Sequence, residues 1–126
     1  MCGISFYCCL EANKVEELNK SLAVTSHRGP DASGVATDNV GEYFVGLGHN
    51  RLSIMDLSEA GCQPMRSGAG NIISYNGEIY NHVPLRSQLE ILGHNFIGNS
   101  DTEVILRLYD EFGKKSFSML RGMFSF

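Results

Sequence analysis

The chain has 126 residues and a mass of 13.9 kDa, which is the size of a single domain. Apolar residues make up 43% of it and charged residues 19%, a balance typical of folded globular proteins rather than disordered ones. The formal net charge is −4, and the Lys and Arg residues do not cluster. The composition therefore argues against a nucleic-acid partner and against binding to an anionic membrane.

The sequence carries no membrane or secretion signal. No apolar run approaches the roughly 20 residues that a membrane helix needs. The N-terminus lacks the basic start and long apolar core of a signal peptide, so we expect a cytoplasmic protein. The cysteines and histidines have neither disulfide nor metal-ligand spacing, and no metal site is predicted. They are Cys2, Cys8, Cys9, Cys62, His27, His49, His82 and His94.

The first half of the chain predicts strands around one helix. Asn13 is a suitable helix cap, and Val15, Leu18 and Leu22 then fall on one helix face. The segment from Ser26 to Asp31 contains Gly-Pro and predicts a loop. Strands are expected at Ile4–Leu10, Ser33–Thr37, Tyr43–Leu47 and Leu52–Met55.

The second half predicts a loop over residues 57–70 and then alternating strands and helices. Asn76-Gly77 is a turn signal that directly follows a predicted strand. Ser100 or Asp101 is expected to cap the longest helix. The expected strands are Asn71–Tyr75 and Met123–Phe126, and the expected helices are Val83–Leu92, Thr102–Phe112 and Lys114–Leu120. Such blocks of strands and helices fit sheets that helices cover.

Cys2 is the first candidate for chemistry. Removal of Met1 leaves a free α-amine on the residue that carries the thiol. That amine has a pKa near 7.7–8.0, so part of it is unprotonated at neutral pH and serves as a built-in base. Taken alone, a cysteine at this position is more simply explained as the packed start of a strand. Whether Cys2 has a catalytic role has to be judged from motifs elsewhere in the sequence.

Five motifs follow one another in a specific order along the chain. They are Cys2-Gly3-Ile4, His27-Arg28-Gly29-Pro30-Asp31, Arg51-Leu52-Ser53-Ile54, Asn76-Gly77-Glu78-Ile79-Tyr80-Asn81 and Ser100-Asp101-Thr102-Glu103-Val104-Ile105. In this order they resemble the class II glutamine amidotransferase domain, in its glutamine-hydrolysing asparagine synthetase branch. The resemblance extends over essentially the whole chain, and the ordered set is far more specific than any one motif.

The resemblance implies an α+β fold, the αββα sandwich of the N-terminal nucleophile hydrolases. Residues 1–126 would form the N-terminal part of the glutaminase domain. In the family this domain continues beyond the segment that resembles Gly122–Phe126, so we expect the sandwich to be incomplete at the C-terminus and the chain to be truncated. No pyrophosphate-binding Ser-Gly-Gly loop is present, and the synthetase domain is expected to be absent.

The resemblance also assigns roles to residues of the site. Cys2 is the catalytic nucleophile, and Asn76 and Gly77 donate hydrogen bonds to the oxyanion. Arg51 binds the α-carboxylate of glutamine and Asp101 its α-ammonium. Packing or backbone contacts to the substrate are expected from Leu52, Ser53, Ile54, Met55 and Glu78. Read individually, the same residues also fit a hairpin turn, a surface arginine and a helix cap.

The implied reaction is hydrolysis of L-glutamine to glutamate and ammonia through a Cys2 thioester. The ammonia would supply an asparagine synthetase-type amidation in a synthetase domain or chain, which is expected to use ATP and Mg²⁺. No cofactor is expected in this domain itself. The alternative is a non-catalytic remnant that acts as a glutamine-binding or interaction module. A thiol redox protein is disfavoured because no second cysteine is suitably spaced from Cys2. The oligomeric state is open, a homo-oligomer included.

Overall fold

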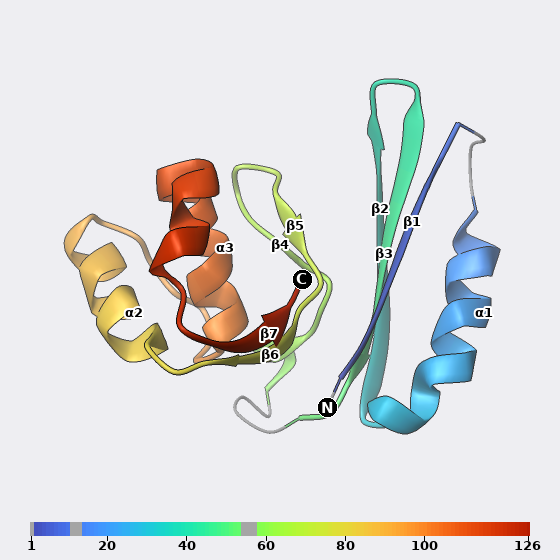
Figure 1. Cartoon of the computed structure of the whole chain (residues 1–126), viewed down its shortest axis with the longest axis horizontal. Helices are drawn as coiled ribbons and strands as arrows, with labels where there is room; N and C mark the ends of the chain where they lie inside the picture. The colour runs from blue at the N-terminus through green and yellow to red at the C-terminus, as the bar shows by residue number, and fades with distance from the viewer. Residues whose placement is uncertain (1, 11–13, 54–57) are drawn as a thin grey trace.

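The computed structural model describes residues 2–10, 14–53 and 58–126. It contains both helices and antiparallel strand pairs (Figure 1), which is consistent with the predicted α+β fold. In order they are β1 (Gly3–Cys9), α1 (Val15–Thr25), the 3-10 turn η1 (Ser26–Arg28), β2 (Ala32–Val40), β3 (Tyr43–Arg51), η2 (Glu59–Gly61), β4 (Met65–Arg66), β5 (Ile72–Ile73), β6 (Asn76–Ile79), α2 (His82–Ile91), α3 (Asp101–Phe112), η3 (Gly113–Met119) and β7 (Gly122–Ser125).

The N-terminal half is an antiparallel sheet of three strands in the order β1-β3-β2, with α1 on one face (Figure 1). Leu18 and Leu22 are the buried residues of α1, as their spacing predicts. They pack directly on Gly46 and Gly48 of β3. A Cβ atom at Gly46 would lie 2.3 Å from Cδ1 of Leu18, so a larger residue here would force the Leu18 side chain to move.

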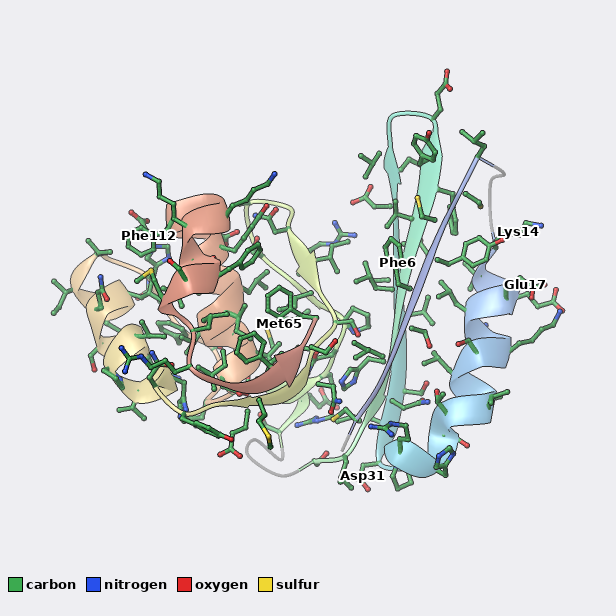
Figure 2. The ribbon with its side chains drawn as sticks, viewed as in Figure 1. Phe6, Lys14, Glu17, Asp31, Met65 and Phe112 are labelled. Carbon is green, nitrogen blue, oxygen red and sulfur yellow. The ribbon has the colours of Figure 1, made fainter. Side chains whose placement is uncertain are left out.

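The C-terminal half packs α2 and α3 against two short antiparallel pairs, β4-β5 and β6-β7. The core residues Ile79, Leu89, Val104 and Leu108 are completely buried. Figure 2 shows Met65 among the side chains between the β4-β5 pair and α3. The side chain of Ser100 accepts a hydrogen bond from the Glu103 nitrogen, so Ser100, and not Asp101, is the cap of α3.

The two halves meet on the face of the sheet that α1 leaves uncovered (Figure 1). The Ser74 hydroxyl donates to the carbonyl of Gly48 at 2.9 Å, and His49 Nε2 lies 3.0 Å from the carbonyl oxygen of Tyr75. Farther along the sheet, Arg66 forms an ion pair with Asp38 at 3.1 Å. These contacts hold the link between β5 and β6, and the end of β4, beside the sheet. The αββα sandwich itself stays a prediction.

Several local predictions were wrong. Leu52 and Ser53 lie outside any strand, while Ile54, Met55 and the predicted cap Asn13 lie outside the described residues. Residues 57–70 are not a continuous loop, because η2 and β4 fall inside them, and η1 occupies part of the predicted Ser26–Asp31 loop. The Asn76-Gly77 pair is not a hairpin turn but the start of β6. Turn propensity is overridden there by pairing with β7, where Gly77 stands opposite Phe124.

Candidate functional site

A cavity of about 540 Å³ opens where the N-terminal sheet meets β6, β7 and α3. Its size lies within the range of ordinary small-molecule sites. The predicted residues that line it are Cys2, Arg51, Leu52, Asn76, Gly77, Glu78 and Asp101. Ser53 is described but is not one of the lining residues, and Ile54 and Met55 lie outside the described residues. The fold thus gathers residues from four of the motifs around one space.

Cys2 stands at the entrance to β1, next to the end of β3. Its sulfur lies 3.4 Å from the backbone nitrogen of Leu52 and 3.8 Å from the Leu52 carbonyl oxygen. Arg28 fixes its backbone, because the Arg28 Nε donates to the Cys2 carbonyl at 3.2 Å. The thiol is partly exposed, so it remains accessible from the cavity.

The His27–Asp31 segment forms hydrogen bonds with residues of the site but does not line the cavity. Arg28 contacts Cys2, and the Asp31 carboxylate accepts a 2.7 Å hydrogen bond from the Ser53 nitrogen. The Asp31 nitrogen in turn donates to the Arg51 carbonyl at 3.0 Å. Figure 2 places Asp31 at the end of the sheet where β1 begins in Figure 1. None of the segment's residues lines the cavity, so its contribution is to hold Cys2, Arg51 and Ser53 in place.

Arg51 is a basic residue in the cavity lining and is only 8% exposed. Its Nη1 donates to the carbonyl of Ser58 at 2.9 Å and to the sulfur of Cys62 at 3.4 Å. These acceptors fix the orientation of the guanidinium group on one side. A planar group held this way is suited to binding a carboxylate.

Asp101 is one of the two acidic residues that line the cavity, with Glu78, and is 5% exposed. Its Oδ2 accepts hydrogen bonds from the Tyr75 hydroxyl at 2.7 Å and from the Ile79 nitrogen at 3.0 Å. Burial, and then the Asp101 carboxylate, raise the pKa of Tyr75 far above its ordinary value. The tyrosine therefore keeps its proton and acts as a donor to Asp101.

Asn76 and Gly77 line the cavity from β6. An added Cβ atom at Gly77 would lie 2.3 Å from the Met123 carbonyl oxygen and 2.5 Å from the Phe124 Cα, and the residue has a φ of +155°. Glycine is required here because β7 passes so closely. This reason differs from the turn that the sequence predicts, although both favour the same residue.

Two polar residues that organise the cavity wall, Gln63 and Tyr75, are not among those that the sequence predicts. Gln63 lines the cavity, accepts from the Tyr75 nitrogen through Oε1 at 2.7 Å and donates through Nε2 to Thr102 at 3.2 Å. Tyr75 bonds to Asp101, as described above. Neither has a local sequence signal, because Gln63 lies in a segment read as loop and Tyr75 in one read as an ordinary strand. Their partners are 12 to 39 residues away.

None of the helices in the described ranges has the length and apolar character that a membrane crossing requires.

Comparison with known proteins places these observations in a family. Residues 1–126 match the family described as the glutamine amidotransferase domain. A protein named amidase chry2 from Gibberella zeae is 46% identical over 89% of this chain and 16% of its own length. A putative glutamine-hydrolyzing asparagine synthetase of Methanocaldococcus jannaschii is 38% identical over 100% of this chain and 27% of its own length. The glutamine-hydrolyzing asparagine synthetase B of Escherichia coli is 40% identical over 100% and 22%, respectively.

These matches cover 89% to 100% of this chain but only 16% to 27% of the relatives' own length. The cavity that contains the N-terminal cysteine motif, the Arg51 motif, the Asn76-Gly77 pair and Asp101 lies entirely inside the matched region. The chain belongs to the glutamine amidotransferase domain family.

Proposed function

We propose that this chain hydrolyses the side-chain amide of L-glutamine and supplies the ammonia to an asparagine synthetase-type amidation. The observation that carries the proposal is that the residues the reaction needs line a single cavity. This arrangement places the Cys2 thiol, the Arg51 guanidinium group and the acidic residues Glu78 and Asp101 around a space of about 540 Å³. Free glutamine carries an α-carboxylate and an α-ammonium, so its binding needs both charges at fixed positions. Family membership and relatives named glutamine-hydrolyzing support the same reaction.

In the proposed complex Arg51 binds the α-carboxylate and Asp101 binds the α-ammonium. Both side chains are buried, and hydrogen bonds to the protein hold them in place. Their charges act over short distances with little competing water, which strengthens each interaction. The two contacts fix the amino-acid end of glutamine and leave its side-chain amide to reach toward Cys2.

The proposed chemistry begins with transfer of the Cys2 thiol proton to the α-amine of the same residue, once Met1 has been removed. The thiolate then attacks the amide carbon of glutamine and forms a tetrahedral oxyanion. Donors from the Asn76 side chain and the Gly77 backbone N–H stabilise that negative charge. The carbon–nitrogen bond breaks as the ammonium form of Cys2 returns its proton, and ammonia leaves behind a thioester.

Water completes the proposed cycle. It attacks the thioester carbon, with its proton passing to the Cys2 amine, and the same oxyanion donors act again. The carbon–sulfur bond breaks, glutamate is released, and Cys2 recovers its thiol. ATP and Mg²⁺ belong in this proposal to the synthetase domain or chain that consumes the ammonia, and no cofactor takes part in the steps at Cys2.

Ammonia release from L-glutamine tests the proposal. Purified chain whose intact mass shows that Met1 is absent is compared with Cys2→Ala and with Cys8→Ala, a thiol control on the exposed side of β1. We expect release from the parent and from Cys8→Ala, and none from Cys2→Ala. Activity that persists in Cys2→Ala contradicts the role of Cys2. A parent chain that binds glutamine without releasing ammonia supports the alternative, a non-catalytic glutamine-binding module.

A further inference from the structure

Tyr75 is held at every polar group that it possesses. Its nitrogen donates to Gln63 Oε1 at 2.7 Å, its carbonyl lies 3.0 Å from His49 Nε2, and its hydroxyl donates to Asp101 Oδ2 at 2.7 Å. The residue is only 2% exposed, yet it is among those that line the cavity. A tyrosine buried for packing alone needs one partner for its hydroxyl. Tyr75 instead has three hydrogen-bond partners, Gln63, His49 and Asp101, which come from three other segments of the chain.

These contacts connect two parts of the proposed site. Along the backbone, Tyr75 directly precedes Asn76, so the Gln63 and His49 contacts fix the start of β6, where the oxyanion donors stand. Through its ring, Tyr75 reaches the first turn of α3 and holds Asp101. A single side chain thus bridges the strand that faces the amide end of glutamine and the carboxylate that faces its α-ammonium.

The geometry at Asp101 shows how the hydroxyl acts. Both donors to this carboxylate, the Tyr75 hydroxyl and the Ile79 nitrogen, bind the same oxygen, Oδ2. Two donors on one oxygen fix the rotation of the carboxylate about its Cβ–Cγ bond. Among the described residues, Oδ1 receives no hydrogen bond, and this is the oxygen left to accept from a ligand.

We propose that Tyr75 is a positioning residue, which sets the affinity of the site for α-ammonium compounds by orienting the Asp101 carboxylate. The inference rests on the proposed function, since it takes Asp101 as the partner of the glutamine α-ammonium. Without the tyrosine proton, Asp101 keeps only one donor and its carboxylate rotates more freely. Binding of an α-ammonium then has to restrict that rotation, which weakens affinity.

The test measures L-glutamine binding by titration calorimetry in a Cys2→Ala background, where no hydrolysis takes place. Tyr75→Phe is expected to weaken binding roughly tenfold, the loss typical of one hydrogen bond to a charged group. Phe keeps the ring that fills the core, and thermal unfolding verifies that each variant is folded. Replacement of Tyr75 by 4-aminophenylalanine keeps a donor at the same place and is expected to restore most of the affinity.

A double-mutant cycle separates positioning from general packing. If Tyr75 acts through Asp101, Tyr75→Phe has less than about a twofold effect once Asp101→Asn is present, because the carboxylate that it orients is gone. The matched control is Tyr109→Phe, which alters a tyrosine stacked on Phe117 and away from the cavity, and which should leave the affinity unchanged.

Three outcomes overturn the inference: parental affinity in Tyr75→Phe, equal weakening in both backgrounds, or failure of 4-aminophenylalanine to restore binding in a folded protein. They differ from failure of the proposed function. If the Cys2→Ala chain with Tyr75 intact does not bind L-glutamine, the proposed function is wrong at its first step. If it binds but Tyr75→Phe has no effect, only the inference about Tyr75 is wrong.

Discussion

The sulfur of Cys2 lies 3.4 Å from the backbone nitrogen of Leu52, although the two residues are 50 positions apart in the sequence. The register of the sheet produces this contact, because Gly3 pairs with Asn50 on the antiparallel strands β1 and β3. Arg51 therefore ends β3 beside the start of β1. The separation between the proposed nucleophile and the proposed carboxylate-binding group is set by strand pairing and not by a flexible loop, which suits a site that must align a substrate before reaction.

Arg51→Lys is expected to raise the KM for L-glutamine about tenfold and to change kcat less. Lysine preserves the charge but has no planar fork, so it cannot bind a carboxylate through two parallel hydrogen bonds. Its single nitrogen would have to serve Ser58, Cys62 and the substrate together, whereas Arg51 donates to Ser58 and Cys62 through Nη1 alone. Steady-state ammonia release measures both constants. Arg86→Lys on α2 is the control, and an unchanged KM in Arg51→Lys would contradict the assignment.

An additional residue placed before Cys2 is expected to abolish glutamine hydrolysis while leaving glutamine binding in place. The extension moves the free α-amine away from the thiol and removes the proposed base. Two preparations are compared by intact mass, ammonia release and calorimetry: one with Cys2 at the N-terminus, the other with one extra glycine. Equal rates in the two preparations would show that the α-amine is not the base.

Much of the fold follows from local patterns in the sequence. The spacing of Leu18 and Leu22 predicts α1, and the apolar stripe through Val104 and Leu108 predicts α3, because amphipathic periodicity records which face is buried. The short strands are less predictable. Pairing partners decide whether Asn76-Gly77 turns or extends, and β7 lies far along the chain. Local turn propensity has no information about that partner.

Some residues of the candidate site can likewise be predicted from the sequence, and others cannot. Motif order predicts Cys2, Arg51 and Asp101, since each motif resembles the family as a unit, and the cavity contains all three. Gln63 and Tyr75 could not be predicted, because their importance lies in hydrogen bonds to segments distant in sequence. A glutamine in a loop and a tyrosine in a strand have no spacing or composition that distinguishes them.

Gly77→Ala is expected to destabilise the fold by about 1–3 kcal/mol, the range of overpacked positions, and to abolish ammonia release. The new Cβ would stand 2.3 Å from the Met123 carbonyl and force β6 and β7 apart. Gly68→Ala is the matched control, since no atom lies within 4 Å of its added Cβ. Its unfolding free energy should stay within about 0.5 kcal/mol of the parent. Urea unfolding measures both, and equal stabilities would contradict the close approach of β7.

The burial of His49 leads to a prediction of how the free energy of unfolding depends on pH. It is fully buried, and burial lowers its pKa below the ordinary value of 6.5. A carbonyl oxygen only accepts, so Nε2 carries the proton that it donates to Tyr75, and Nδ1 is a buried atom with no hydrogen-bond partner. Protonation of the ring would place a charge there without a partner. The native state thus favours the neutral form.

Because the folded pKa lies below the unfolded one, the contribution of His49 is fully present above about pH 6.5 and is lost as the pH falls through the folded value. We expect the parent to lose more stability than His49→Gln between pH 7 and pH 5, since glutamine keeps a donor for the Tyr75 carbonyl but does not titrate. Urea unfolding across this range gives the difference. His94→Gln is the control, because the ring of His94 is near the surface beside Glu111, outside the core. If the unfolding free energies of the parent and His49→Gln change with pH in parallel, the pKa of His49 is the same in the folded and unfolded states and the prediction is wrong.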